Sequence, residues 1–296
     1  MSTVSSALRR APRRFSGTRH SPWEVGKRAL VYCVFLLVTA VVVLPVAWIV
    51  LVSLRTQSEY TSYPITFLPT RAHWENYYRA VFEYPFLKHT WNSLQMAVPS
   101  TILTVLSSAL AGFGFARHRA PLRNAMFILV LSMLMVPRMV TAVPTFMVFC
   151  RLRLTDTYWP WVLWGLAGSP YHIFLFRQFF AAIPRDLEDA AEVDGCGRFR
   201  IFWQIFMPIS GPVIATASLF HFQWVWGDWF TAQVFLTASK TSLAVLLSTA
   251  YSDPKGFPLN TLTLAAITVY IMPVLIVFFA AQRQIIQGIV TTGLKG

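Results

Sequence analysis

The sequence predicts an all-α, polytopic membrane protein with six transmembrane helices and with both termini in the cytoplasm. Of its 296 residues, 55% are apolar and only 12% are charged, a balance that soluble domains of this length rarely show. Six apolar stretches are each long enough to cross a hydrocarbon core of about 30 Å, which takes roughly 20 helical residues. Lys and Arg are distributed unevenly around these stretches, and this asymmetry orients the chain.

Residues 1–28 form a basic tail, which we expect to be cytoplasmic and disordered. Its only acid is Glu24. The apolar run that follows is too long for a signal peptide, and no small-residue cleavage site precedes Leu54, so we expect an uncleaved first span. The net charge of +13 does not predict a nucleic-acid partner, because long uncharged runs separate the basic residues and cytoplasmic segments of membrane proteins collect such residues.

The six predicted spans make up a transmembrane domain over residues 29–296. They are Ala29 to Leu54, Asn92 to Ala116, Asn124 to Val148, Tyr158 to Phe180, Pro208 to Ala232 and Asn260 to Gln282. An even number places both ends on one side of the membrane. With the N-terminus inside, the cytoplasmic segments carry roughly twice as many Lys and Arg residues as the outer segments, which supports this orientation.

Two patterns within the spans predict a packed bundle with irregular helices. Ser108, Gly112 and Ala116 lie four residues apart, a stripe that lets helix backbones approach closely. Proline would kink the spans, and lipid tolerates this only where neighbouring helices or a water-filled cavity satisfy the freed carbonyls. Such a set of broken helices suits a transport path. The prolines concerned are Pro45, Pro99, Pro137, Pro144, Pro170, Pro212 and Pro273.

A polar segment, residues 184–208, separates the fourth and fifth predicted spans. Pro184 ends the fourth span, and Asp186 is expected to cap a short helix whose first turn carries acids that complement the helix dipole. Ala190 and Ala191 are expected to present a surface with almost no side chain. Gly195 can adopt a positive φ, so it is expected to stop this helix and turn the chain.

Beyond this corner, aromatic residues recur at the spacing of one helical face. Phe199, Phe202, Trp203 and Phe206 stand at i, i+3, i+4 and i+7. We therefore predict two short helices at an elbow, the second with one apolar face. From spacing alone, an amphipathic loop lying on the membrane surface is the alternative.

The run DAAEVDGCGRFRIFWQIFMP within this segment resembles the EAA segment of ABC importer membrane subunits. It departs from the usual pattern at Asp189, where Glu is common, and at Cys196, where a small Ala is often found. The resemblance implies a fold of the type I ABC importer kind and a coupling helix that contacts an ATPase. The residues it implies for coupling are Asp189, Ala190, Ala191, Asp194, Gly195, Phe199, Phe202, Ile205 and Pro208.

The chain carries no motif for a reaction of its own. It has no phosphate-binding loop, no H-E-x-x-H and no G-x-S-x-G, and its three cysteines include no C-x-x-C pair. We expect no catalytic residue, no metal site and no bound cofactor. The resemblance implies instead two partner ATP-binding subunits that hold ATP and Mg²⁺, a second homologous permease subunit, an extracytoplasmic solute-binding protein, and a place among the lipids of a bacterial or archaeal cell membrane.

Three short stretches resemble the maltose-type, or carbohydrate, branch of these importers. They are QRQIIQGIVTTGLKG at residues 282–296, WGDWF at residues 226–230, and Asn92-Ser93-Leu94. Gly227 stands where this branch often has Asn. The resemblance implies a permease subunit for a sugar or an oligosaccharide, with the segment from Thr231 to Leu259 meeting the binding protein.

Several polar and aromatic residues within the spans are candidates for the solute path. Arg138 and Asp228 each carry a charge that costs roughly 2.5 to 3.5 kcal/mol to insert, so they either line the path or satisfy each other structurally. His221 and Gln223 either line the path or form a packed polar core. Trp226 and Trp229 are three residues apart and are expected to share a helical side, for stacking on a sugar or for an interfacial belt.

The sequence is also compatible with functions other than carbohydrate import. An importer of the same superfamily for a polyol, glycerol phosphate or another small solute would share most of these features. An ion-coupled secondary transporter would be expected to carry intramembrane carboxylates, and Asp228 is nearly alone. A membrane scaffold would be favoured only if solute uptake survived deletion of the chain.

Overall fold

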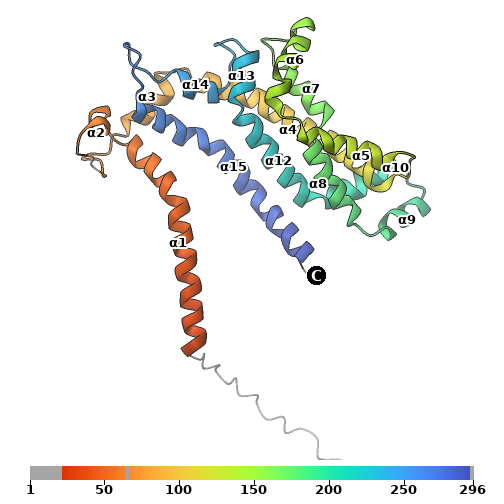
Figure 1. The fold of residues 1–296 in the computed structure, drawn as a ribbon. Helices are drawn as coiled ribbons and strands as arrows, with labels where there is room; N and C mark the ends of the chain where they lie inside the picture. Colours follow the sequence, from red (N-terminus) through yellow and green to blue (C-terminus); the bar gives the residue numbers. More distant parts are fainter. Residues whose placement is uncertain (1–21, 65–66, 294–296) are drawn as a thin grey trace, which may run out of the picture. The chain divides into compact units, whose positions relative to one another are not determined.

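The computed structural model describes residues 22–64 and 67–293, and the regular elements in these ranges are helices (Figure 1). One isolated β-bridge joins Ser252 and Pro258. The chain divides into two units, Met1–Trp48 and Ile49–Gly296. The predicted all-α class is therefore confirmed.

Helix α1 runs over Pro22–Ser53 and contains Pro45. It begins seven positions before the predicted start at Ala29, so the predicted boundary of the basic tail at residue 28 is wrong, and Lys27 and Arg28 are helical. The remainder of that tail, residues 1–21, lies outside the described residues. Because α1 is apolar around its whole circumference, it has the composition of a helix surrounded by lipid.

Two short helices occupy the segment between the first two predicted spans. Helix α2, Gln57–Thr61, starts with a capping box between Thr56 and Glu59. Helix α3, Glu75–Phe82, buries Asn76, whose side-chain amide donates to the carbonyls of Ser53 at 2.8 Å and Arg55 at 2.7 Å. These bonds satisfy carbonyls that the end of a helix leaves without a partner.

Helix α4, Phe86–Arg117, is the central helix of the second unit and starts at Phe86 rather than at the predicted Asn92. A Cβ added to Gly112 would lie 2.7 Å from the Cβ of Phe176, so the backbones of α4 and α8 are in close contact there. The hydroxyl of Ser108 accepts a hydrogen bond from the amide of Ser169 at 3.0 Å. The predicted small-residue stripe is thus confirmed as a packing surface.

The third predicted span is wrong as a continuous helix. Helix α5, Arg123–Ser132, and the 3₁₀ turn η1, Met133–Met135, are followed by helix α6, Arg138–Arg151, at a bend of 100°. Pro137 causes the break: it has no N–H to donate, and it disfavours helical geometry at Val136, which is extended.

The fourth predicted span is also interrupted. It consists of α7, Trp159–Ala167, and α8, Pro170–Ala181. Gly168 has a φ of +75°, a conformation that glycine adopts readily, and Pro170 then opens α8 in the position where a missing N–H costs nothing. The prediction of one helix from Tyr158 to Phe180 is therefore wrong.

The polar segment folds into several short elements before the next long helix. These are α9, Asp186–Val193, α10, Arg198–Ile201, the π-helix η2, Phe202–Phe206, and α11, Met207–Ile209. Helix α12, Gly211–Trp226, follows at a bend of 80°. Helix α12 ends at Trp226, so the fifth predicted span, which extends to Ala232, is wrong in its C-terminal part.

The remaining elements are α13, Trp229–Phe235, α14, Leu243–Thr249, and α15, Asn260–Gly293. Within the second unit, Figure 1 shows α9 and α10 at one end and α13 and α14 at the other, with α12 running between them. This arrangement separates two regions that the sequence marks as functional.

Three helices in the described ranges are long and apolar enough to cross a membrane: Gly26–Ser53, Phe86–Arg117 and Asn260–Ile286. The number becomes five if the bent pairs Arg123–Met135 with Arg138–Arg151, and Arg198–Ile209 with Gly211–Trp226, each count as one span. Four of the seven noted prolines lie inside helices and three lie at helix starts, where they mark breaks. The internal ones are Pro45, Pro99, Pro144 and Pro273.

Two apolar clusters hold the second unit together. One surrounds Trp226 and Leu243 and joins α4, α12, α14 and α15. The other contains Phe113 of α4, Phe176 and Phe180 of α8, and residues of the polar segment. The second cluster therefore attaches that segment to two helices of the bundle.

Candidate functional sites: an elbow segment and a cavity at Arg138

The elbow segment, residues 184–208, begins with an acidic helix. The first turn of α9 contains Asp186, Glu188 and Asp189, which complements the positive end of the helix dipole. The predicted capping role of Asp186 is wrong, because this residue lies inside the helix. Arg185 precedes the helix in helical geometry and makes no side-chain capping bond in the described structure.

Helix α9 presents two different faces. Glu188 and Ala191 point inward and are each 7% exposed, whereas Asp189, Ala190 and Asp194 are exposed. Successive residues of an α-helix lie about 100° apart, so neighbours fall on different sides. The prediction that both alanines form an open surface is therefore wrong for Ala191.

Gly195 forms the corner of the elbow, as predicted. Its φ is +79°, and an added Cβ would meet no described atom within 4 Å. Its amide donates to the carbonyl of Glu192 at 3.0 Å, and the next amide, of Cys196, donates to Ala191 at 2.9 Å. These bonds close the C-terminus of α9 in the manner of a glycine-terminated helix.

The second arm of the elbow differs from the predicted amphipathic helix. Phe202 and Phe206 are 1% and 0% exposed, but Phe199 and Trp203 are 67% and 42% exposed, so the four aromatic residues do not share one face. The chain forms a π-helix here, whose i→i+5 bonds widen the turn and change the period of the faces. Ile205 is half-buried and Pro208 is exposed.

An ion network that the sequence reasoning missed anchors α9. The guanidinium of Arg117, at the end of α4, lies 3.6 Å from the carboxylate of Glu188 and 5.0 Å from the ring centre of Phe206. It also donates to the carbonyls of Phe180, at 2.6 Å, and Ile183. The sequence did contain a signal for this network: Arg117 is a basic residue at the end of an apolar stretch, and the polar segment contains several acids that could pair with it.

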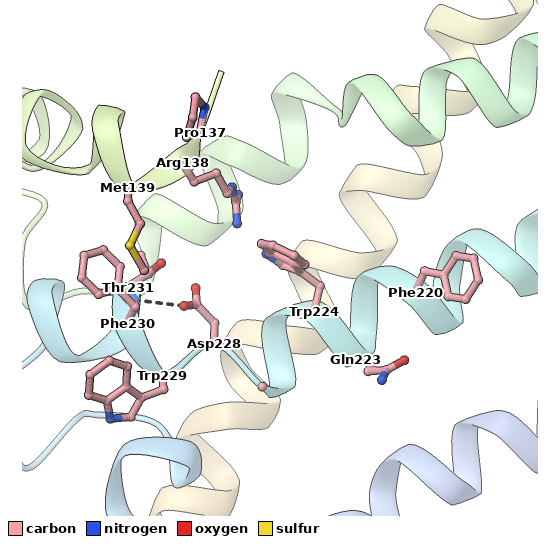
Figure 2. A pocket seen from close by; sticks show the side chains of 11 residues that line it. Pro137, Arg138, Met139, Phe220, Gln223, Trp224, Asp228, Trp229, Phe230 and Thr231 are labelled. Carbon is pink, nitrogen blue, oxygen red and sulfur yellow. Dashed lines mark hydrogen bonds between the residues drawn. The ribbon is translucent and has the colours of Figure 1, made fainter. Parts of the chain in front are cut away.

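A cavity of about 700 Å³ lies where three broken elements meet, at the start of α6, the end of α12 and the start of α13. We call it the Arg138 cavity; Figure 2 shows its side chains. It exists because the breaks at Pro137 and at Gly227–Asp228 leave no continuous helix to fill the space. Its lining residues are Pro137, Arg138, Met139, Phe220, Gln223, Trp224, Gly227, Asp228, Trp229, Phe230 and Thr231.

The two charged residues of this cavity are held separately. The guanidinium of Arg138 lies over the ring of Trp224, 4.7 Å from its centre. The carboxylate of Asp228 accepts from the amide of Thr231 at 2.9 Å and so caps α13 (Figure 2). Although both residues lie in the described part of the chain, they form no ion pair with each other. The alternative in which they satisfy each other is therefore not what the structure contains.

A second cavity, also of about 700 Å³, shares Arg138 and Trp224 with the first and is lined by His172 and His221. The Nε2 atom of His221 lies 3.0 Å from the hydroxyl of Ser100 and 3.1 Å from that of Thr104. The Nε2 atom of His172 donates to the carbonyl of Ala217 at 3.1 Å. Both rings are thus part of a polar core that also borders a cavity. No group of described His, Cys, Asp and Glu side chains is arranged to hold a metal ion.

The structure brings together most, but not all, of the predicted path residues. Gln223 and Trp229 join Arg138 and Asp228 in the first cavity. Trp226 is 1% exposed, stacks on Phe222 and Tyr270, and lines neither cavity. The prediction that Trp226 and Trp229 share a helical side is wrong, because the backbone leaves the helix between them.

Comparison with known proteins identifies the class of this chain. Residues 104–291 match the family described as binding-protein-dependent transport system inner membrane component, and the chain belongs to that family. It is 36% identical over 207 residues to the osmoprotective compounds uptake permease protein GgtD of Synechocystis sp., covering 69% of each chain. It is 32% identical over 263 residues to the lactose transport system permease protein LacG of Rhizobium radiobacter, covering 87% of this chain and 93% of the relative.

The fold has a counterpart among solved structures. A chain in the crystal structure of a bacterial ABC transporter involved in the import of the acidic polysaccharide alginate superposes with a TM-score of 0.75 at 20% identity, covering 89% of this chain and 98% of that one. The resemblance seen in the elbow segment is thus confirmed. This protein is a polytopic membrane permease subunit of an ABC importer.

Proposed function

We propose that this subunit forms half of the translocation path for a sugar or an oligosaccharide and couples that path to partner ATPases. The observation that carries the proposal is the coincidence of an exposed acidic elbow with a large cavity at broken helices in one chain of this family. The C-terminal resemblance to the carbohydrate branch and the kinship with a lactose permease support the solute class. A cavity of about 700 Å³ falls within the usual size range of ligand sites.

The proposed architecture has six spans with both termini in the cytoplasm of a bacterial or archaeal cell. Three continuous helices and two bent pairs would supply five crossings if each bent pair is one span, and α7 with α8 would supply the remaining one. The distribution of Lys and Arg supports a cytoplasmic elbow. The proposed permease domain includes the whole of α1, from Pro22 on, and contains the coupling segment, residues 184–208.

The exposed face of α9 is the proposed docking surface for an ATP-binding subunit. Asp189, Ala190 and Asp194 offer charge with little bulk, which suits insertion into a groove of a partner, and Gly195 sets the corner. Two such partners would bind ATP and Mg²⁺, and this chain would bind no cofactor. A second homologous permease subunit, surrounding lipid and an extracytoplasmic binding protein complete the proposed assembly, with no role for nucleic acid.

The proposed solute path follows the two cavities that share Arg138. Gln223, Asp228 and Trp229 would contact solute in the first, and His221 in the second. Aromatic rings such as Trp224 and Trp229 suit the apolar faces of sugar rings, which are amphipathic partners. Trp226 would support this region from the core side of α12.

The proposal is tested with the complete importer reconstituted in proteoliposomes, with ATP supplied on the ATPase side and binding protein on the other. Uptake of labelled lactose and maltodextrins is compared with uptake of mannitol and glycerol phosphate. We expect ATP-dependent and binding-protein-dependent uptake of a saccharide. Uptake of mannitol alone would favour the small-solute alternative, to which the similarity with an osmoprotective-compound permease points. Uptake driven by an ion gradient without ATP would contradict the proposal altogether.

A further inference from the structure

Arg117 is the meeting point of four elements. It is the last residue of α4, its side chain is only 4% exposed, and its guanidinium contacts two carbonyls at the C-terminal end of α8. The same group faces Glu188 of α9 and the ring of Phe206 in η2. A charge buried to this degree is stable only when it is paired and hydrogen-bonded, so this geometry ties all four elements to one side chain.

Glu188 completes the connection from the elbow side. Its side chain is 10% exposed, and besides Arg117 it lies 3.8 Å from Arg198, which reaches it from the exposed side. The adjacent acid, Asp189, is exposed. Two neighbouring carboxylates of one short helix therefore point in different directions, one toward the bundle and the other toward solvent.

The backbone alone does not hold α9 rigidly against the bundle. The chain leaves the helix on both sides of α9, around Pro184 before it and from Gly195 to Gly197 after it. Ala191 adds apolar packing, but its side chain is a single methyl group. The Arg117–Glu188 ion pair, at 3.6 Å and largely buried, is the charged contact that links α9 to α4.

We propose that Arg117 and Glu188 are positioning residues that lock α9 to the ends of α4 and α8, so that a push on the exposed face of α9 moves these helices as one body. The proposal rests on the proposed docking of an ATPase at that face. It assigns different tasks to the two adjacent acids: Asp189 meets the partner, and Glu188 transmits the movement. Breaking this ion pair should lower the amount of solute transported per ATP hydrolysed.

The test uses the complete importer with Glu188→Gln, Arg117→Lys and the double variant. Glutamine keeps the shape of Glu188 without its charge, and lysine cannot reproduce the forked contacts of a guanidinium. We expect each single variant to assemble and to lower solute uptake per ATP hydrolysed about tenfold. The double variant should lose less than the sum of the two single losses, because each single variant already weakens the ion pair that the two residues share. Arg198→Ala removes the outer contact to Glu188 and the pair with Glu192 at 3.2 Å but leaves the Arg117–Glu188 pair in place, and it should stay within about twofold of the unchanged protein.

Three results would overturn the proposal: an unchanged ratio of uptake to ATP hydrolysis in both single variants, additive losses in the double variant, or failure of Glu188→Gln to assemble. Asp189→Ala separates this outcome from the fate of the proposed docking face. If Asp189→Ala has no effect on uptake or ATP hydrolysis while Glu188→Gln lowers their ratio, the docking face is wrong and the positioning role stands. If only Asp189→Ala has an effect, the positioning role is wrong.

Discussion

Arg117 and Arg138 are two arginines of one apolar unit, and each places its guanidinium over an aromatic ring, at 5.0 Å from Phe206 and 4.7 Å from Trp224. Beyond that they differ. The Arg117 side chain is 4% exposed, donates to two carbonyls and forms an ion pair with a carboxylate. Arg138 is exposed and lines both cavities, and in the described part of the chain its guanidinium makes no hydrogen bond or ion pair.

The difference separates a structural charge from an available one. A buried guanidinium with all of its strong contacts inside the protein holds elements together, and removing one partner leaves a costly unpaired charge. A cation over a ring beside a large cavity retains donors for a polar ligand. The residue type alone therefore does not distinguish an arginine that positions helices from one that is available to bind a ligand. The contacts around each guanidinium make that distinction.

The largest effect that would sharpen this comparison is expected from Gly112→Leu, in the tightly packed region near Arg117. An added Cβ would lie 2.7 Å from Phe176 Cβ and 2.9 Å from the backbone nitrogen of Arg177, so the two helices must separate. We expect a loss of about 3 kcal/mol in the free energy of unfolding, measured as folded yield and thermal stability in detergent. Gly114→Ala is the matched control, because an added Cβ there meets no described atom within 4 Å. Equal stability of both variants would contradict the close packing.

The next effect is expected from Arg138→Ala at the open region. Loss of the cation should leave folding and assembly intact, because it removes only the contact with the exposed ring of Trp224, and should raise the KM for uptake about tenfold, which corresponds to about 1.4 kcal/mol. Arg138→Lys should recover part of this loss. The comparison between the two arginines breaks down if Arg138→Ala reduces folded yield as strongly as Arg117→Ala.

A smaller effect on stability is expected from substitutions of Asp228, whose side chain both caps α13 and carries a charge. Asp228→Asn keeps a side-chain oxygen for the amide of Thr231 but removes the charge, whereas Asp228→Ala removes both. We expect Asp228→Ala to lower stability by about 1 kcal/mol, as the loss of a helix cap does, and Asp228→Asn to leave the melting temperature nearly unchanged. A fall in uptake with Asp228→Asn at normal stability would then report the charge alone.

The smallest effect is expected at Asp156, in an exposed pair with Lys240 at 3.0 Å. Bonds from the Thr237 amide and hydroxyl, and then from Lys240, hold the pKa of Asp156 at about 2, below its ordinary 3.8. Because the folded pKa is depressed, this stabilisation is present above pH 4 and is lost as the pH falls toward 2. Hydrogen exchange at Thr237, corrected for its intrinsic pH dependence, should show protection that fades in that window. Asp156→Asn should weaken protection at neutral pH and flatten the change.

The sequence identified the two regions but not their internal geometry. Gly195 was predicted at the elbow corner and has a positive φ, because a helix stop with that geometry depends on one residue and its nearest neighbours. The prediction that Phe199 and Trp203 share a helical face with Phe202 and Phe206 is wrong, because the π-helix over Phe202–Phe206 widens the turn and changes the residue spacing of each face. Phe202 and Phe206 pack in the cluster with α4 and α8, whereas Phe199 and Trp203 are exposed. Asp186 failed as a cap because the helix starts one residue earlier than local preference indicates.

What the sequence determined by itself was the all-α membrane class, the helix stop at Gly195, and the family to which the chain belongs. Composition, Pro and Gly act over a few residues, so their consequences are readable along the chain. Only the tertiary structure decided that Glu188 turns inward to Arg117 and that Arg138 and Asp228 share a cavity without pairing. Those outcomes depend on contacts between residues about 70 to 90 positions apart, which arise when packed helices meet and no local pattern records them.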